Sequence, residues 1–169
     1  AKGFKKLDVN YSTADLGLAL GVSIKTINFK DRKTGNYRKN YTRVDAELRA
    51  EAKDYHDRQP FSVLVAVIFL PVDACDDSTS QSPSSFGLAV KYFRTRAARK
   101  GPRDEAELFE RVFLGLYEHS GPDAGQVFFF DVTNAPPKAG RPTRDTATLK
   151  DLIAAFEHEY EVRNDPPFQ

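Results

Sequence analysis

One stretch of the chain limits its fold more than any other, namely residues 61–70, which read FSVLVAVIFL. Almost every side chain in it is apolar, and most are β-branched or aromatic. Such a run is typical of a central strand that is covered on both faces. A second apolar run at residues 126–132 (QVFFFDV) predicts another buried strand. We therefore expect a sheet enclosed between layers of helices.

The periodicity of the remaining segments predicts the other elements. Residues 1–12 have no clear pattern, whereas residues 16–20 and 22–29 are predicted to be two strands that meet near Gly21. A helix is expected from a cap at Thr42, with Asp45 as its capping partner, to about Arg58. Further helices are expected over roughly residues 86–97, 107–117 and 148–163. This order predicts a single α/β domain over residues 1–169, a mixed central sheet flanked by helices.

The composition narrows the class of protein. Hydrophobic residues make up 40% of the 169 and charged residues 29%, which is typical of a globular domain. No apolar run reaches the roughly 20 residues of a membrane-spanning helix. A single cysteine, Cys75, excludes an internal disulfide and a Cys/His zinc site, and it indicates a reducing, cytoplasmic compartment. Since the chain contains no Met, we interpret it as a fragment or a processed form.

The apolar ribbon at residues 14–27 contains one lysine, Lys25, which needs an anionic partner on a strand. Asp15 is predicted to lie on the preceding strand. Ser23 should share a face with Lys25 because strand side chains alternate. Glu47 and Glu51 are four residues apart and so lie on one face of the following helix. Each glutamate is either a metal ligand or an ordinary surface acid paired with a base such as Arg43.

These residue types suit metal-assisted cleavage of a phosphodiester bond. Mg²⁺ takes carboxylate oxygens, water and substrate phosphate as ligands, and Mn²⁺ is an alternative. A nearby lysine can orient the attacking water or stabilise charge in the transition state. We therefore consider Asp15, Glu47 and Glu51 as candidate metal ligands and Lys25 and Ser23 as catalytic partners.

The arrangement of Asp15 followed by Ser23-Ile24-Lys25 resembles the PD-(D/E)xK nuclease superfamily, to which most type II restriction endonucleases belong. A subgroup of those enzymes has Ser-x-Lys and recruits a glutamate from the following helix, which would be Glu47 or Glu51 here. The resemblance covers about residues 12–70. Ala14 stands where a proline often precedes the acid, and the interval from Lys25 to Glu47 is longer than usual. The helix that usually precedes the first acid is absent.

Basic residues dominate the segment that contains this motif. Residues 1–43 carry ten Lys or Arg against three Asp, a net charge of +7 that leaves −6 for the rest of the chain. We expect the following side chains to contact DNA phosphates: Lys30, Arg32, Lys33, Arg38, Lys39 and Arg43. A solvated loop is the simpler alternative. A second basic stretch, residues 91–103, either clamps the duplex or forms a solvated helix end.

The resemblance implies a Mg²⁺-dependent endonuclease of the restriction or phage-defence type, in the cytoplasm of a prokaryote. Its partner would be double-stranded DNA, and cleavage of both strands would suit a homodimer. The alternative is a catalytically inactive DNA- or protein-binding module on the same restriction-endonuclease-like fold. A small-molecule enzyme is the third reading, but no nucleotide-binding motif supports it.

Overall fold

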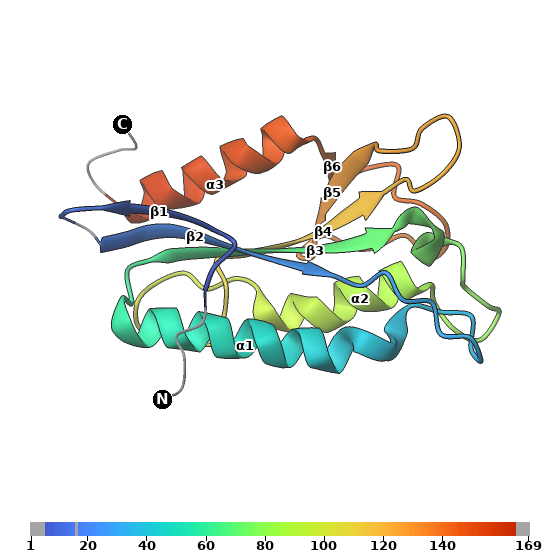
Figure 1. The fold of residues 1–169 in the computed structure, drawn as a ribbon, viewed down its shortest axis with the longest axis horizontal. Helices are drawn as coiled ribbons and strands as arrows, with labels where there is room; N and C mark the ends of the chain where they lie inside the picture. The colour runs from blue at the N-terminus through green and yellow to red at the C-terminus, as the bar shows by residue number, and fades with distance from the viewer. Residues whose placement is uncertain (1–5, 16, 165–169) are drawn as a thin grey trace.

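A mixed β-sheet runs through the centre of the molecule in the computed structural model of the chain, which describes residues 6–15 and 17–164 (Figure 1). Within these residues the sheet has six strands, and their spatial order follows the sequence. The strands are β1 (Val9–Thr13), β2 (Gly17–Thr26), β3 (Val63–Pro71), β4 (Arg111–Tyr117), β5 (Val127–Asp131) and β6 (Thr146–Ala147).

Helices cover both faces of this sheet (Figure 1). The helices α1 (Tyr41–Arg58) and α2 (Ser85–Phe93) lie on one face, and α3 (Leu149–Arg163) lies on the other. Three short 3₁₀ helices occupy connections, at Arg38–Asn40, Val72–Cys75 and Arg94–Arg96. The predicted α/β class, a mixed central sheet flanked by helices, is confirmed.

The connections explain why α1 and α2 share a face. The strands β2, β3 and β4 are parallel neighbours, so each pair needs a crossover, and α1 and α2 supply the two crossovers. The outer pairs, β1 with β2 and β4 with β5, are antiparallel. The parallel strands therefore begin at one edge of the molecule and all end at the other, where the loops of β2 and β3 lie.

The strand β3 is the centre of the core, as its sequence predicts. All its side chains are buried except Phe69, which is partly buried. One cluster of buried side chains packs between the sheet and α1 and α2, and includes Leu48, Leu64 and Phe86. A smaller cluster packs beneath α3 and includes Val65 and Leu152.

The hairpin that contains the candidate motif differs from the prediction. The strand β2 continues through Gly21 without turning, and its antiparallel partner is β1, within the segment expected to be irregular. Gly21 is needed for close packing rather than for a turn, because a Cβ there would lie 2.3 Å from Leu7 Cδ1 and 2.9 Å from Leu64 Cδ2. Ala14 and Asp15 lie in the turn of the hairpin, and residue 16, where the first strand was predicted to begin, is outside the described residues.

The prediction of a helix over residues 107–117, after Asp104, is also wrong. Residues 111–117 form β4, which pairs in parallel with β3 and is buried on both faces. The expected cap of α1 differs as well, because the helix begins at Tyr41 and Asp45 bonds Arg96 instead. The helix α3 does begin at the predicted Thr148, which forms a capping box with Asp151.

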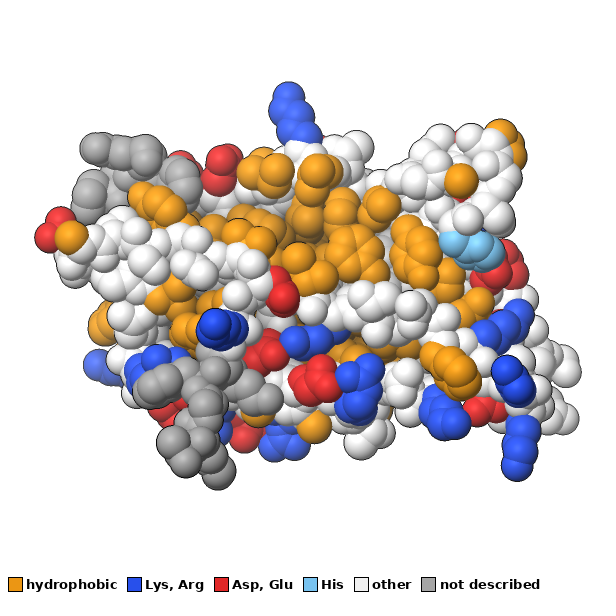
Figure 2. All heavy atoms as spheres, viewed as in Figure 1, with side chains coloured by type: hydrophobic (Ala, Val, Ile, Leu, Met, Phe, Trp, Pro, Cys, Tyr) orange, Lys and Arg blue, Asp and Glu red, His pale blue; other side chains and the backbone are white. Residues whose placement is uncertain are grey.

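Hydrophobic side chains remain visible between α3 and the sheet (Figure 2). Exposed apolar residues on these elements include Ile24, Leu149 and Ile153, whose exposed fractions are 39%, 60% and 47%. Within the described part of the chain, no helix has both the length and the apolar character needed to cross a membrane.

Candidate functional site

Three side chains predicted to act together meet between β2 and α1. The Lys25 Nζ donates to Glu51 Oε1 at 2.6 Å, and the Ser23 hydroxyl donates to Glu51 Oε2 at 2.5 Å. Both oxygens of one carboxylate are therefore held by two side chains from the same strand. Lys25 therefore finds its anionic partner in Glu51 of α1, whereas the sequence had suggested Asp15.

The local sequence explains this contact. Ser23 and Lys25 alternate with Ile24, so both point to the α1 side of β2 while Ile24 points to the other. Glu51 precedes Ala52 on the buried side of α1, and the helix places it over β2. Lys25 pairs in parallel with Ile68 of β3, and this register fixes the position of the lysine along the strand direction.

The cluster is largely shielded from water. Ser23 is fully buried, and the side chains of Lys25 and Glu51 are 15% and 7% exposed. A buried ion pair gains from the low dielectric but loses the hydration of both charges, so it contributes little net stability. The Lys25 side chain is thus only partly covered, while Ser23 is sealed from solvent.

A second carboxylate, which sequence reasoning missed, reaches the same strand segment. Asp8 immediately precedes β1, and its Oδ2 accepts the backbone N–H of Ile24 at 2.6 Å. The backbone N–H of Asp8 in turn donates to the Val22 carbonyl at 3.1 Å. Asp8 and Glu51 thus both contact residues 23–25. The signal in the sequence was an acid ahead of a short alternating stretch, which we interpreted as irregular chain.

Asp15 does not lie with this cluster, contrary to the expectation. It is an exposed residue in the turn between β1 and β2, whereas Lys25 lies near the other end of β2. Residues 17 and 25 alone are separated by roughly 26 Å at about 3.3 Å per residue. The cause is the uninterrupted course of β2 through Gly21, which moves the hairpin turn away from the lysine.

Glu47 lies one turn before Glu51 on α1 but takes a different partner. Its carboxylate accepts from Arg43 at 2.6 Å, and its side chain is 34% exposed. Of the two candidate glutamates, the structure brings only Glu51 to Lys25. Arg43, predicted to contact phosphate, forms this i,i+4 pair and is itself 57% exposed.

The other predicted DNA-contacting residues divide into two groups. Lys30, Arg32, Lys33 and Lys39 are exposed on the loop between β2 and α1. Arg38 instead turns toward the protein, where its Nη1 and Nη2 donate to Ser82 Oγ at 3.0 Å and to the Pro83 carbonyl at 2.6 Å.

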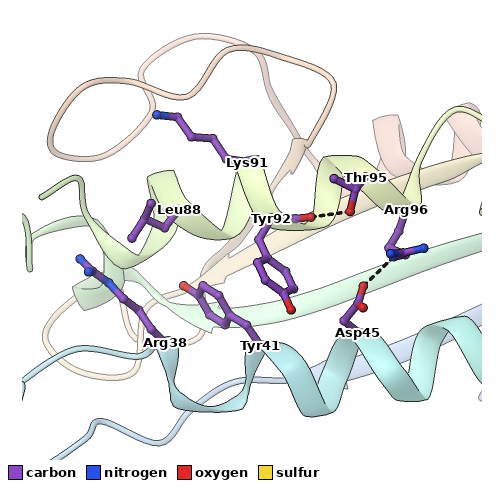
Figure 3. Close-up of a pocket in the computed structure, with 8 residues that line it drawn as sticks. All are labelled: Arg38, Tyr41, Asp45, Leu88, Lys91, Tyr92, Thr95 and Arg96. Carbon is purple, nitrogen blue, oxygen red and sulfur yellow. Dashed lines mark hydrogen bonds and ion pairs between the residues drawn. The ribbon is translucent and has the colours of Figure 1, made fainter.

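Arg38 lies at one end of a groove between α1 and α2 that has a volume of about 560 Å³ (Figure 3). Tyr41 and Tyr92 lie in its middle with ring centroids 5.6 Å apart. At the other end Arg96 Nε donates to Asp45 at 2.6 Å (Figure 3). The groove is thus walled by aromatic rings, and one of its cations is neutralised.

Three of the six cations in the second basic stretch, Arg94, Arg96 and Arg99, bond within the protein through their side chains. Arg94 donates to the carbonyls of Val132 and Asn134, at 2.7 and 2.5 Å. Arg99 is buried and donates to Glu110 Oε1 at 2.9 Å. These two arginines join the end of α2 to the sheet, whereas Lys91, Lys100 and Arg103 are exposed, as the interpretation of a solvated helix end expects.

The donor set around residues 23–25 suits a small divalent cation. Each carboxylate oxygen of Asp8 and Glu51 that accepts one hydrogen bond keeps a second lone pair. Mg²⁺ is usually held by one or two carboxylates, with water and phosphate as its other ligands. Across residues 6–15 and 17–164, no three His, Cys, Asp or Glu side chains gather to form a complete protein site.

Comparison with known proteins adds no relative. No family model, no curated protein and no solved structure matches this chain. Its function has to be argued from the site itself.

Proposed function

We propose that the protein is a metal-dependent DNA endonuclease of the restriction or defence type, acting in the prokaryotic cytoplasm. The observation that carries the proposal is the contact of Ser23 and Lys25 with the two oxygens of Glu51. This contact supports the Ser-x-Lys variant of the nuclease motif, in which a helix glutamate replaces the second strand acid. We assign to Asp8 the metal-binding role first given to Asp15, because its Oδ2 accepts the N–H of Ile24, next to Lys25.

Each side chain has a role that follows from its position. Hydrolysis joins a water oxygen to phosphorus and breaks the bond to the leaving sugar oxygen, which takes up a proton. The Lys25 ammonium would stabilise the negative charge that grows on the phosphate oxygens. Ser23 holds Glu51, and through it Lys25, in a fixed orientation.

A divalent cation, Mg²⁺ or Mn²⁺, would be held by Asp8 and Glu51 and would polarise the phosphate and its attacking water. The exposed lysines and arginines after β2 would contact phosphates and set the register of the DNA. Glu47 stays close to this site, but its pairing with Arg43 assigns it to the surface.

The experiment is a cleavage assay on duplex DNA with Mg²⁺ or Mn²⁺. We expect Asp8→Asn and Glu51→Gln each to lower the cleavage rate by about 100-fold or more. Asp15→Asn is the matched control, since it removes one carboxylate from the same hairpin, and its rate should stay at the wild-type value. Circular dichroism and urea unfolding show whether each variant is folded.

The outcomes separate the proposal from its rival. Metal-dependent cleavage that survives in Asp8→Asn and Glu51→Gln would assign the activity to another site or to a contaminant. DNA binding with no metal-dependent cleavage in the wild-type protein would identify an inactive binding module. The satisfied Glu51 carboxylate favours that rival, because both its oxygens already have partners.

One site per chain cuts one strand, so we propose that duplex cleavage is carried out by a homodimer. Sedimentation velocity of the protein on duplex DNA should give two chains per duplex, and the cleavage rate should rise with the square of protein concentration when the dimer is scarce. If one chain binds each duplex and both strands are still cut equally, the proposed homodimer would be contradicted.

A further inference from the structure

The loop between β2 and α1 is folded around one carboxylate. Asp31 Oδ1 accepts the backbone N–H groups of Lys33 and Thr34 at 2.9 and 3.0 Å. Two backbone bonds of 2.8 Å, Asp31 N–H to Asn36 and Gly35 N–H to Asp31, close the turn. Gly35 has a φ of 68°, which suits glycine. The loop therefore has a defined shape stabilised by its own hydrogen bonds.

An exposed phenylalanine lies at the base of this loop. Phe29 keeps 47% of its surface accessible, and the Lys39 Nζ lies 5.5 Å from the centroid of its ring. The ring lines a depression of about 420 Å³ together with Asp31, Arg32, Lys33 and Lys39. An aromatic face is thus presented to solvent among cations.

The charges around this ring are mostly unneutralised. Three cations that line the depression (Arg32, Lys33 and Lys39) accompany one acid, Asp31, and the Nζ of the neighbouring Lys30 lies 5.9 Å from the centroid of the Tyr37 ring. The Asp31 carboxylate lies 3.8 Å from the Nζ of Lys39, a long contact in which the lysine is 62% exposed and the aspartate 20% exposed. Basic side chains gather at the end of the molecule where this loop follows β2 (Figures 1 and 2). The surface therefore attracts a polyanion and offers it a flat apolar face.

The position of the ring relates it to the candidate site. Phe29 is four residues after Lys25, and an extended chain of that length spans at most about 14 Å. Ile27 N–H donates to the Phe69 carbonyl at 2.8 Å, which holds the connecting chain against β3. One strand of bound DNA can therefore contact both Lys25 and Phe29.

We propose that this loop binds a single-stranded stretch of DNA, with an unpaired base stacked on Phe29 and its phosphates on Lys30, Arg32, Lys33 and Lys39. The inference rests on the proposed function and sharpens it, because the substrate would carry unpaired nucleotides beside the scissile bond. A paired base inside a duplex has both faces covered by its neighbours, so it cannot stack on a side chain. Stacking on a phenyl ring accepts every base, so this contact carries little sequence preference.

The absence of Trp from the chain permits a direct test. Phe29→Trp places a single indole at the site, and Phe61→Trp places one at another exposed phenylalanine, which is 63% accessible and follows α1. Each protein is titrated with oligothymidylate of about 12 nucleotides, a length typical of single-strand sites. The titration contains EDTA and one fixed salt concentration, so cleavage plays no part.

We expect stacking to quench the fluorescence of Phe29→Trp strongly and that of Phe61→Trp hardly at all. Phe29→Leu should weaken the binding of a labelled oligothymidylate by about tenfold, the loss typical of one base–aromatic stack. The same change should alter duplex binding less than twofold, and Phe61→Leu should alter neither. Thermal unfolding of each variant checks that the fold is retained.

Equal quenching of the two indoles, or wild-type affinity in Phe29→Leu, would overturn the inference. An equal loss for single strands and duplexes would also overturn it. The proposed nuclease is judged separately, by cleavage in Asp8→Asn and Glu51→Gln. If binding depends on Phe29 and cleavage survives in those two variants, the proposal of single-strand binding by the loop is supported. Only the assignment of the active site to Asp8 and Glu51 is then rejected.

Discussion

At the scale of single residues, variants of the buried Lys25–Glu51 pair can distinguish a contribution to the stability of the fold from a contribution to cleavage. Taking one partner away leaves a shielded charge, which costs about 3–5 kcal/mol, whereas replacing both partners with apolar side chains is often neutral. We therefore expect Lys25→Met and Glu51→Leu each to lower the free energy of unfolding by about 3 kcal/mol. The double variant should regain most of that loss and still lack cleavage. Urea unfolding at pH 7 measures the stabilities.

Two other results would change this interpretation. A double variant as unstable as the sum of the single variants would mean that the pair supports the fold itself. A double variant that still cleaves DNA would remove Lys25 and Glu51 from the mechanism. Arg43→Met with Glu47→Leu is the matched control, because this exposed pair on the same helix should contribute only about 0.5 kcal/mol.

The same residues show what sequence could and could not predict. Ser23, Lys25 and Glu51 were predicted because strand alternation and helix spacing act over a few residues. The choice between Glu47 and Glu51 needed the rotation of α1 over the sheet, which local pattern does not specify. Asp8 was missed because its role depends on the register of a hairpin that was placed wrongly.

At the scale of elements, the errors occurred where tertiary packing decides between two local patterns. Residues 108–117 (LFERVFLGLY) carry apolar side chains that fit helical spacing as well as a buried strand. Pairing with β3 favours the strand, because β3 would otherwise have one unpaired edge. Seven residue pairs of β3 and β4 align in parallel. Gly115 fits this outcome, because a Cβ there would lie 2.7 Å from the ring of Phe69.

At Gly21, too, tertiary packing decided between two local patterns, and here the strand continued where a turn was predicted. A glycine between apolar residues usually indicates a turn or a bulge, so two short strands were predicted. In the structure the glycine makes room for Leu7 and Leu64, and the strand continues. By contrast, α1, β3 and α3 were predicted well, because their apolar patterns are long and their ends carry capping residues or proline.

At the scale of the whole molecule, the charge asymmetry of the sequence has a spatial counterpart. The exposed cations of the β2–α1 loop lie at one end of the sheet, where the parallel strands finish. Near the start of β4, at the opposite end, acids are paired with arginines inside the protein. Glu110 is the centre of that network, since Arg99 and Arg163 both approach its Oε1, at 2.9 and 3.1 Å.

Glu110 joins four parts of the fold and predicts how stability depends on pH. Its Oε2 accepts Leu64 N–H at 2.7 Å and lies 3.6 Å from His56 Nε2. Burial alone would raise the pKa of this carboxyl, but the nearby His56 ring and the bonds from Leu64 N–H and Arg99 outweigh burial and hold the pKa below its usual 4.5. A carboxyl with a lowered pKa stabilises the fold above the pKa of the unfolded chain. That stability disappears as the pH falls through the folded value.

We therefore expect Glu110→Gln to lower the free energy of unfolding by about 3 kcal/mol at pH 7, because it leaves buried arginines without their counter-ion. The difference from wild type should stay constant down to about pH 5 and then shrink as the pH falls below about 4.5. Urea unfolding at a series of pH values from 7 to 3 gives both curves. Glu107→Gln, which removes an exposed partner of Arg49, should produce a small shift at every pH. A constant difference between Glu110→Gln and wild type across the acid range would contradict this prediction, because it would mean that the pKa of Glu110 is the same in the folded and unfolded chains.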